Sequence, residues 1–371
     1  MKKITAVLTA FVSALIFTLN CCGEPADITA QSAILINADT GEILYEKNAH
    51  EQRAMASTTK IMTALLTIEA GQPDKRFIAD SMAIRVEGTS MGLKEGDIVT
   101  RRALCYGMLL PSGNDAANAA AVNVAGSISA FADMMNKKAA EIGMKNTHFV
   151  TPSGLDADGH YSTAYDMAIL TAYAMKNEDF RKICGLTSAS LEYGNPPYKR
   201  TLYNSNKLLK QYEGCIGVKT GFTDNARRCL VSAAERDGIT LIAVTLNAPD
   251  DWKDHSAMLD YGFSVTEAAH ITPESFTLPV LGGDRETVDA VPEYTDSIGV
   301  SEGGSENIHI KYHLPDFLYA DIDKGEQVGT AKIYYKNREI SSIPLVAAQD
   351  CRRLAPEKSV FGHFLEFFGL S

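Results

Sequence analysis

Two strand-turn-strand patterns, separated by a long helical stretch, most constrain how this chain can fold. Residues 32–46 (SAILINADTGEILYE) place apolar-rich segments on both sides of an Asp-Thr-Gly turn, and residues 229–246 (CLVSAAERDGITLIAVTL) repeat the pattern around Asp-Gly. Between them, residues 61–70 are apolar on nearly every side, which indicates a buried helix, and residues 129–142 and 165–175 are amphipathic. Strands at both ends with helices between them predict an α+β domain, in which the two hairpins pair in one antiparallel sheet flanked by helices.

A second, smaller domain is expected after residue 270. The 371 residues are too many for one ordinary core and fit two domains with appendages. Beyond residues 271–274 the chain alternates apolar and polar residues, as at Ile308, Ile310 and Tyr312, around turns rich in Gly, Asp and Asn. We therefore predict a first domain over residues 28–270 and a small β-sandwich-like domain over residues 275–352.

The N-terminus has the pattern of an export signal. Lys2 and Lys3 precede an apolar run over residues 4–19, and small residues follow it. The run is 16 residues long, short of the ~20 that a membrane-spanning helix needs. We predict a signal peptide over residues 1–23, and the alternative is an uncleaved anchor. Cys21 and Cys22 raise a further alternative, lipidation, which the lack of small residues just before Cys22 disfavours.

The C-terminal residues 355–371 (APEKSVFGHFLEFFGLS) form a second unusual segment. One helical face would carry five apolar residues, namely Val360, Phe361, Phe364, Leu365 and Phe368. A solvent-facing helix should not expose so much apolar surface, and the segment is too short to span a bilayer. We predict an amphipathic helix that associates with a membrane surface. The alternative is a helix docked on its own β domain.

Charge and cysteine content argue against two classes of ligand. The formal net charge is −11, whereas nucleic-acid binding needs a basic surface. The cysteines lack CxxC spacing and no cluster of histidines accompanies them, so we expect no metal site. Outside the leader we expect buried free thiols at Cys105, Cys184, Cys215, Cys229 and Cys351.

The first of three short motifs, Ser57-Thr58-Thr59-Lys60, opens the buried helix. Unpaired amides in a first helical turn favour negative charge developing on a serine oxygen, and a lysine three residues on can reach that oxygen. The amine can act as a base only when it is neutral, so its pKa must be lowered by burial and a neighbouring cation. Taken alone, the motif also fits a capping serine followed by a surface lysine.

The other two motifs lie at turns and strand ends. Ser112-Gly113-Asn114 falls between two helical segments, on a tight turn that projects a hydroxyl and an amide together. Lys219-Thr220-Gly221 lies at the edge of a predicted strand, where glycine lets backbone or ligand approach closely. Ordinary turn chemistry and an ordinary strand end explain each of them alone.

In this order and spacing, the three motifs resemble those of the penicillin-recognising serine enzymes, the DD-peptidases and serine β-lactamases. The strings MGLKEGD, LLPSGNDAANA, FVTPSGLDADGHYSTAYDMA and GVKTGFT are similar to the low-molecular-weight penicillin-binding proteins, the D-alanyl-D-alanine carboxypeptidases of peptidase S11 type. The resemblance is close over residues 32–263 and looser in the β domain and tail. It implies a β-lactamase/transpeptidase-like first domain, followed by a small all-β domain and an amphipathic helix.

The resemblance also implies roles for the residues of the first two motifs. Ser57 matches the nucleophile that forms an acyl-enzyme, and Lys60 matches its general base. Ser112 matches the residue that relays a proton to the leaving D-alanine. Asn114 matches the residue that holds both the substrate amide and Lys60.

For the third motif, the resemblance implies substrate binding. Lys219 and Thr220 match the residues that attract the substrate's terminal carboxylate, and the charge of Lys219 would lower the pKa of Lys60. The oxyanion hole would be the backbone N–H groups of Ser57 and of Phe222, the residue after Gly221.

Four positions depart from the family's pattern or stand outside it. Phe222 replaces the histidine of some relatives, and Arg227 stands where a glycine or small residue is expected. An arginine that binds the carboxylate in some relatives has no match in residues 248–252. His160 lies in an acidic loop as a candidate metal or acid-base residue, although a solvated loop histidine is the simpler interpretation.

The implied function is removal of the terminal D-alanine from peptidoglycan pentapeptides, which regulates cross-linking. The resemblance implies covalent inhibition by β-lactams and action outside the cytoplasm, at the outer face of the bacterial cytoplasmic membrane. It implies no cofactor. One alternative is a class A β-lactamase, which needs a further glutamate in an E-x-x-L-N pattern; Glu192 and Asn195 only imitate that spacing. A second alternative, an inactive wall-binding homologue, is disfavoured because all three motifs are complete.

Overall fold

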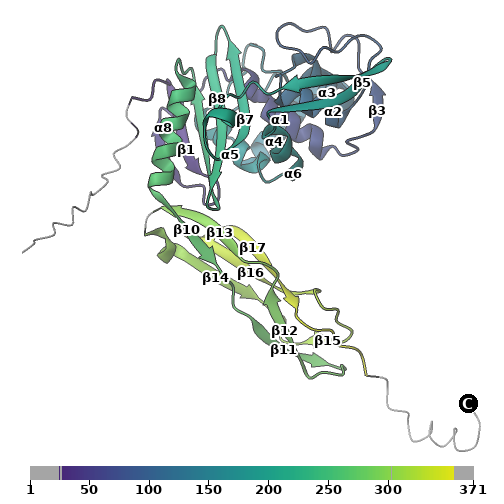
Figure 1. Cartoon of the computed structure of the whole chain (residues 1–371), viewed down its shortest axis with the longest axis vertical. Helices are drawn as coiled ribbons and strands as arrows, with labels where there is room; N and C mark the ends of the chain where they lie inside the picture. The colour runs from purple at the N-terminus through teal and green to yellow at the C-terminus, as the bar shows by residue number, and fades with distance from the viewer. Residues whose placement is uncertain (1–24, 26, 302, 355–371) are drawn as a thin grey trace, which may run out of the picture.

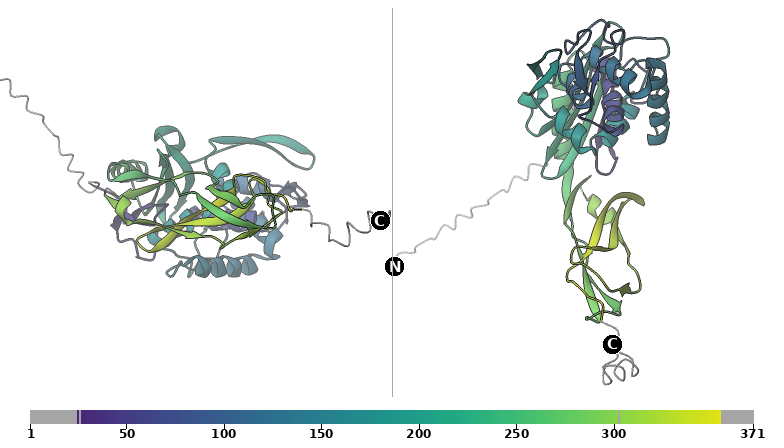
Figure 2. Two further views of the ribbon diagram at one scale, coloured as in Figure 1. Left: turned by 90° about the horizontal axis from the view of Figure 1, so that it is seen from below. Right: turned by 90° about the vertical axis from the view of Figure 1, so that its right-hand side faces the viewer.

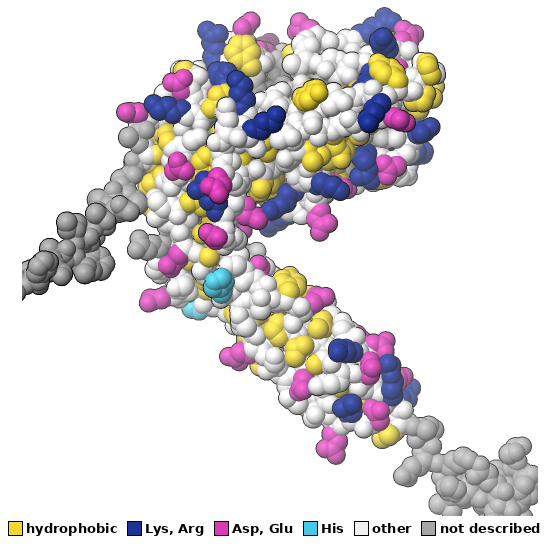
Figure 3. Space-filling view, in the orientation of Figure 1, with side chains coloured by type: hydrophobic (Ala, Val, Ile, Leu, Met, Phe, Trp, Pro, Cys, Tyr) yellow, Lys and Arg dark blue, Asp and Glu magenta, His cyan; other side chains and the backbone are white. Residues whose placement is uncertain are grey.

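The computed structural model describes residue 25, residues 27–301 and residues 303–354. The predicted leader (1–23) and amphipathic tail (355–371) lie outside these described residues. The described chain forms a broad first domain of helices around a sheet and a slender second domain of strands, which extends from one end of the first (Figures 1 and 2). The space-filling view shows the same narrow extension below the larger body (Figure 3).

The first domain is built on a five-stranded antiparallel sheet with the order β2-β1-β9-β8-β7. Its strands are β1 (Ser32–Asn37), β2 (Ile43–Lys47), β7 (Cys215–Thr223), β8 (Arg227–Arg236) and β9 (Ile239–Leu246). β1 pairs with β9 from Ser32 opposite Leu246 to Asn37 opposite Leu241. The predicted pairing of the two hairpins is therefore confirmed. β7, which carries the third motif, is an edge strand of this sheet.

Both faces of the sheet are covered, which explains why its central strands are apolar at successive positions. Side chains alternate between the faces of a strand, so Ile34 packs into the core under the helices while its neighbour Leu35 packs against the opposite layer. The opposite layer contains α8 (Asp251–Ser264), which lies across the outer face in Figure 1.

The other face carries most of the helices of this domain. The nucleophile motif lies in a 3-10 turn, η1 (Ala56–Thr59), that leads into α1 (Lys60–Glu69). The remaining helices are α2 (Arg101–Leu109), α3 (Asn114–Ala125), α4 (Ile128–Ile142), α5 (Ala164–Ala174), α6 (Glu178–Cys184) and, beside β7, the short α7 (Leu208–Gln211). As predicted, α1 is buried along most of its length, from Lys60 to Thr67.

Two small hairpins complete the first domain. β3 (Arg76–Ile78) pairs with β4 (Ile98–Thr100), and β5 (Ser188–Gly194) pairs with β6 (Pro197–Tyr203). Figure 1 shows both hairpins on the helical side of the domain, away from α8.

Over residues 266–301 and 303–354, the second domain consists of strands and one 3-10 turn, η2 (Gly304–Asn307). β10 (Thr266–Ile271) pairs with β13 (Asp296–Ser301). A six-stranded sheet follows in the order β14 (Ile308–His313), β16 (Gln327–Tyr335), β17 (Arg338–Ala347), β12 (Thr287–Pro292), β11 (Phe276–Leu281) and β15 (Leu318–Tyr319). The predicted α+β class is confirmed. The division at residues 270–275 stays a prediction, and β10 is hydrogen-bonded to β13 of the second domain.

The two domains meet at the turn between β1 and β2. Asn37 Nδ2 donates a hydrogen bond to the carbonyl oxygen of Gly299 at 2.8 Å. The Glu42 carboxylate accepts hydrogen bonds from Ser301 Oγ at 2.8 Å, Tyr335 OH at 3.1 Å and Lys336 Nζ at 2.8 Å. The hairpin that opens the sheet therefore also fixes the β domain to it.

The cysteines of the described chain are free thiols, as predicted. Cys105, Cys184, Cys229 and Cys351 are buried, and Cys215 is half-buried. Burial raises the pKa of the Cys105, Cys184 and Cys229 thiols to about 12, so they stay protonated and contribute as small apolar side chains.

Candidate active site

A cavity of about 520 Å³ opens where η1, the turn before α3 and the edge strand β7 meet. It is lined by the predicted site residues Ser57, Ser112, Asn114, Thr220, Gly221 and Phe222, together with Gly88, Thr89, Gly154, Leu155, Ser205, Lys207, Thr223, Arg228, Asp251 and Trp252. The remaining two predicted residues, Lys60 and Lys219, are buried, with exposures of 0% and 1%. The structure thus brings the three motifs together, as the family resemblance implied, while the roles of their residues remain predictions.

The nucleophile motif is held in a tight turn by its own side chains. Thr58 Oγ1 donates a hydrogen bond to Met55 O at 2.6 Å, and Thr59 Oγ1 donates one to Ala56 O at 2.8 Å. Ala56, directly before Ser57, has a φ of +48°, a left-handed conformation that costs energy for a residue with a Cβ. The chain therefore turns sharply just before the serine, which places Ser57 on the cavity wall.

Lys60 has three oxygen atoms around its amine. Nζ lies 2.8 Å from Ser57 Oγ, 2.7 Å from Asn114 Oδ1 and 2.6 Å from the carbonyl oxygen of Ser153. The last two are amide oxygens, which only accept hydrogen bonds, so each takes an N–H group of the amine. A neutral amine then has its lone pair left for Ser57, whose hydroxyl can donate. This geometry allows Lys60 to accept the Ser57 proton.

Electrostatics favour the neutral form of Lys60. Burial, and next the positive charge of Lys219, hold the pKa of Lys60 well below its ordinary value. Burial also lowers the pKa of Lys219, to about 7. Because Lys60 experiences the repulsion of Lys219 in addition to burial, we infer that Lys60 loses its proton first. One lysine is then available as a base while the other keeps its charge.

The second motif occupies the turn between α2 and α3, as predicted. Ser112 has a φ of +68°, and its carbonyl oxygen accepts a hydrogen bond from Thr89 Oγ1 at 2.6 Å. Asn114 donates from its backbone N to Thr89 O and from Nδ2 to Glu87 O, both at 2.7 Å. These bonds orient the Asn114 amide so that its oxygen faces Lys60.

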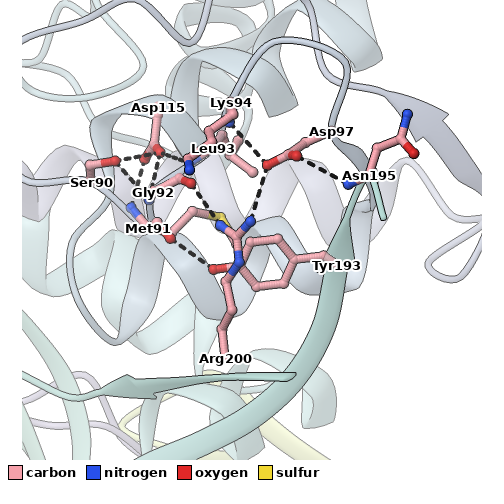
Figure 4. A network of polar contacts seen from close by, with 10 residues as sticks. All are labelled: Ser90, Met91, Gly92, Leu93, Lys94, Asp97, Asp115, Tyr193, Asn195 and Arg200. Carbon is pink, nitrogen blue, oxygen red and sulfur yellow. Dashed lines mark hydrogen bonds and ion pairs between the residues drawn. The ribbon is translucent and has the colours of Figure 1, made fainter. Parts of the chain in front are cut away.

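The neighbouring Asp115, which the sequence analysis did not single out, anchors the loop that makes these bonds (Figure 4). Its carboxylate accepts hydrogen bonds at 2.6–3.1 Å from Ser90 Oγ and from the backbone N–H groups of Met91, Gly92 and Leu93. Asp115 is 1% exposed. A buried carboxylate with so many donors holds the loop firmly against the second motif.

Arg200 on β6 ties the same loop to the β5–β6 hairpin (Figure 4). Its guanidinium donates to Gly92 O at 2.7 Å and to Asp97 Oδ2 at 3.3 Å. The guanidinium carbon lies 4.2 Å and 4.1 Å from the ring centroids of Tyr193 and Tyr198. The 90–93 loop is thus held by Asp115 of α3 and by Arg200 of β6.

The third motif runs along the edge strand β7, close to the nucleophile turn. A Cβ on Gly221 would lie 3.1 Å from Ser57 N and 3.2 Å from Met55 O, so glycine permits this approach. Lys219 Nζ donates to Thr220 O at 2.7 Å. The proposed oxyanion amides of Ser57 and Phe222 therefore belong to segments that lie side by side, and their role stays a prediction.

One departure from the family's pattern, Arg227, lies at a special backbone position. Its φ is +59°, a conformation that suits the glycine expected there from the resemblance. Arg228 lines the cavity, opposite Phe222 in the β7–β8 ladder. Its Nε donates to Asp251 Oδ1 at 3.1 Å, and its guanidinium carbon lies 5.6 Å from the Trp252 ring centroid. Arg228 is thus a cation at the cavity that the sequence analysis missed. Asp251 and Trp252, which support it, belong to the stretch 248–252 in which no arginine was found.

Two further positions bear on the alternative interpretations. His160 is 7% exposed, so the expectation of a solvated loop histidine is wrong; its Nε2 lies 3.0 Å from Thr59 Oγ1. Across the part of the chain that the structure describes, no group of three or more His, Cys, Asp or Glu residues could hold a metal ion. Glu192 lies on β5 opposite Lys199 and does not line the cavity.

Comparison with known proteins identifies both domains. The family model for D-alanyl-D-alanine carboxypeptidase (peptidase S11) matches residues 20–250, and that for the C-terminal domain of penicillin-binding protein 5 matches residues 274–353. The chain is 36% identical to D-alanyl-D-alanine carboxypeptidase DacF of Bacillus subtilis, over 87% of this chain and 86% of that protein. It is 30% identical to DacA of Escherichia coli, over 99% and 94% respectively.

Solved structures of related enzymes share the fold. Penicillin-binding protein 5 from Haemophilus influenzae superposes with a TM-score of 0.64 at 27% identity, covering 89% of this chain and 100% of that one. The DD-transpeptidase of Streptomyces K15 superposes with a TM-score of 0.62 at 33% identity, covering 66% of this chain and 100% of that one. The matched family models and the curated relatives show that the chain belongs to the peptidase S11 family and is a serine-type D-alanyl-D-alanine carboxypeptidase.

Proposed function

We propose that this enzyme removes the terminal D-alanine from peptidoglycan pentapeptides through an acyl-enzyme on Ser57, and thereby limits cross-linking. One observation carries the proposal: Lys60 Nζ lies 2.8 Å from Ser57 Oγ, and its two other partners are amide oxygens. Of the three oxygen atoms around Lys60 Nζ, only Ser57 Oγ carries a proton that a neutral amine can take.

The acylation step follows from this arrangement. Lys60 takes the hydroxyl proton while Ser57 Oγ bonds to the carbonyl carbon between the two D-alanines. The negative charge that develops on the carbonyl oxygen is stabilised by the backbone N–H groups of Ser57 and Phe222. The C–N bond then breaks, and the proton passes from Lys60 through Ser112 to the leaving amine. Water hydrolyses the resulting ester and restores Ser57.

Substrate selection rests on positive charge at the edge of the cavity. The substrate ends in a carboxylate, which Lys219 and Thr220 bind in our proposal. Arg228 supplies a second cation, held in place by Asp251 and Trp252. A carboxylate bound by a lysine and an arginine gains charge-assisted hydrogen bonds that a neutral peptide end would lack.

The same geometry accounts for inhibition by β-lactams. Their strained amide acylates Ser57 in the same way, but the ring opens without releasing a fragment that could diffuse away. Glu192, the residue that imitates the β-lactamase pattern, lies outside the cavity lining, which supports slow deacylation and hence a long-lived adduct.

We further propose that the protein is exported and acts at the outer face of the cytoplasmic membrane. All residues that line the cavity belong to the first domain, so the β domain serves as a spacer. In the described part of the chain, no helix has the length and apolar character needed to cross a membrane. On their sequence patterns, we assign membrane contact to segment 355–371 and export to segment 1–23.

The test uses the purified chain and a peptide that ends in D-Ala-D-Ala. We expect release of free D-alanine, its loss after preincubation with benzylpenicillin, and no labelling of Ser57→Ala by fluorescent penicillin. Rapid turnover of benzylpenicillin would contradict the proposal in favour of a β-lactamase. Absence of D-alanine release from a folded enzyme that still binds the peptide would favour the inactive wall-binding alternative.

A further inference from the structure

His160 lies directly behind the nucleophile turn, although it is 101 residues away from Thr59 in the chain. Its ring is nearly buried, and both nitrogen atoms have partners. Nδ1 accepts a hydrogen bond from the backbone N–H of Val150 at 2.9 Å, and Nε2 lies 3.0 Å from Thr59 Oγ1. Burial lowers the pKa of His160 to about 4, so the ring is neutral at pH 7.

These contacts determine which nitrogen carries the proton. A backbone N–H can only donate, so Nδ1 must be unprotonated and Nε2 must carry the hydrogen. Nε2–H then donates to Thr59 Oγ1, which in turn donates to Ala56 O at 2.8 Å. The chain of hydrogen bonds has one direction, from Val150 through the imidazole and Thr59 to the residue before the nucleophile.

Each end of this chain of bonds reaches part of the catalytic machinery. Ala56 has the left-handed φ of +48° that turns the backbone toward Ser57. Val150 begins the segment that supplies Ser153 O, one of the acceptors for Lys60 Nζ at 2.6 Å. Gly154 of the same segment lies so close that a Cβ there would be 2.0 Å from Ala56 O. His160 therefore joins the turn that carries the nucleophile to the loop that orients the base.

We propose that His160 is a positioning residue for acylation, which fixes Ser57 and Lys60 relative to each other through Thr59 and Val150. The proposal rests on Ser57 being the nucleophile, as proposed above. It differs from the metal and acid-base interpretations of this histidine, because both ring nitrogens are already engaged and neither faces an open coordination site or a reacting atom. Misplacement of a nucleophile by about 1 Å can cost about 10²-fold in rate.

The experiment uses substitutions of different length and shape to remove the hydrogen bonds of His160 to Val150 and to Thr59 separately. In His160→Asn the amide oxygen can replace Nδ1 as the acceptor for Val150, but the donor to Thr59 is lost. In His160→Gln the amide reaches toward the Nε2 position and can still donate to Thr59. Thr59→Val removes the hydroxyl at nearly constant volume, and Thr59→Ser restores it. His148→Asn, an exposed histidine of the same region, is the matched control.

For each variant, the second-order rate of acylation by fluorescent penicillin and the kcat and KM for D-alanine release are measured, with thermal unfolding as a check on folding. We expect His160→Asn and Thr59→Val each to lower the acylation rate by about tenfold or more with KM little changed. The double variant should be no slower than the slower single variant, because both break the same chain of bonds. Thr59→Ser and His160→Gln should retain more activity than Thr59→Val and His160→Asn.

Two results would overturn the proposal. One is a folded His160→Asn enzyme that acylates within about twofold of the unaltered protein. The other is a double variant whose loss is the product of the two single losses, since independent effects would then explain it. Labelling that persists in Ser57→Ala is a different failure: it would refute the nucleophile itself, and this inference with it. Unchanged kinetics in His148→Asn shows that any loss belongs to His160.

Discussion

The two sides of the cavity each contain a buried lysine, but the lysines have different surroundings. On the helical side, Lys60 makes three short contacts with protein oxygens, among them Ser57 Oγ. On the β7 side, the Lys219 amine makes one hydrogen bond within the described part of the chain, to Thr220 O. Lys60 is thus satisfied within the protein, whereas Lys219 retains donors for a ligand.

This difference assigns different steps to the two sides. The helical side is already complete without substrate, so changes there should affect the chemical step. The β7 side, with Arg228, is completed by the substrate carboxylate, so changes there should affect binding first. In kinetic terms, the first class of substitution should lower kcat and the second should raise KM.

The largest effect should come from replacing each of the two lysines in turn. Lys60→Met removes the base at similar side-chain length, and we expect acylation by penicillin to fall by about 10²–10⁴-fold. Lys219→Met should raise the KM of a D-Ala-D-Ala peptide more than it lowers kcat. Stopped-flow acylation and steady-state D-alanine release measure both, and Lys182→Met, an exposed lysine on α6, is the control. Equal effects on kcat and KM in the two variants would remove the distinction between the sides.

The next effect tests how the helical side is held. Asp115→Asn replaces an acceptor-only carboxylate by an amide whose NH₂ group faces N–H donors of the 90–93 loop. We expect a loss of about 1–3 kcal/mol in the free energy of unfolding, because buried donors lose their acceptor. The kcat for D-alanine release should fall because Asn114 is held by the same loop. Denaturant unfolding and steady-state kinetics measure the two effects, and a stable variant with unchanged kcat would show that the loop does not hold Asn114.

A smaller effect is expected on the β7 side at Arg228. Arg228→Gln keeps much of the side-chain volume but removes the charge, so KM for the peptide should rise by about tenfold with a smaller change in kcat. The increase should shrink at high salt, because the arginine is half-exposed and its field is screened. A peptide whose terminal carboxylate is amidated provides the control: its already weak binding should not respond to the substitution.

The smallest effect concerns the neighbouring Arg227, which is exposed and has a φ of +59°. Arg227→Gly relieves the left-handed strain but adds freedom to the unfolded chain, so we expect stabilisation of no more than about 1 kcal/mol. Peptide KM should not change. A KM change like that of Arg228→Gln would mean that charge on this edge acts collectively rather than through one side chain.

The sequence predicted the elements that depend on local pattern. The paired hairpins, the buried helix after Ser57 and the turn around Ser112 follow from apolar spacing and turn residues, and the structure contains all three. The meeting of the three motifs was predicted by resemblance to a known family, not by the pattern itself.

The supporting residues could not be found in the same way. The burial of His160 depends on contact with Thr59, and the position of Arg228 depends on its ladder partner Phe222 and on Asp251. Thr59 and His160 are 101 residues apart and Arg228 and Asp251 are 23 apart, and no local periodicity encodes either contact. For Asp115 there was a usable signal, an acid in the first turn of α3, but its bonds to the 90–93 loop follow only from the fold.

The central claim, a neutral Lys60 beside a charged Lys219, is tested most directly by the pH dependence of kcat/KM for D-alanine release. Activity should rise as increasing pH deprotonates Lys60, whose pKa is held well below its ordinary value, and fall as Lys219 loses its charge, with a pKa of about 7 in the free enzyme. In Lys219→Arg the falling limb should disappear, because a guanidinium stays charged throughout this range. A falling limb unchanged in Lys219→Arg, or activity that rises only where an ordinary lysine titrates, would contradict the account.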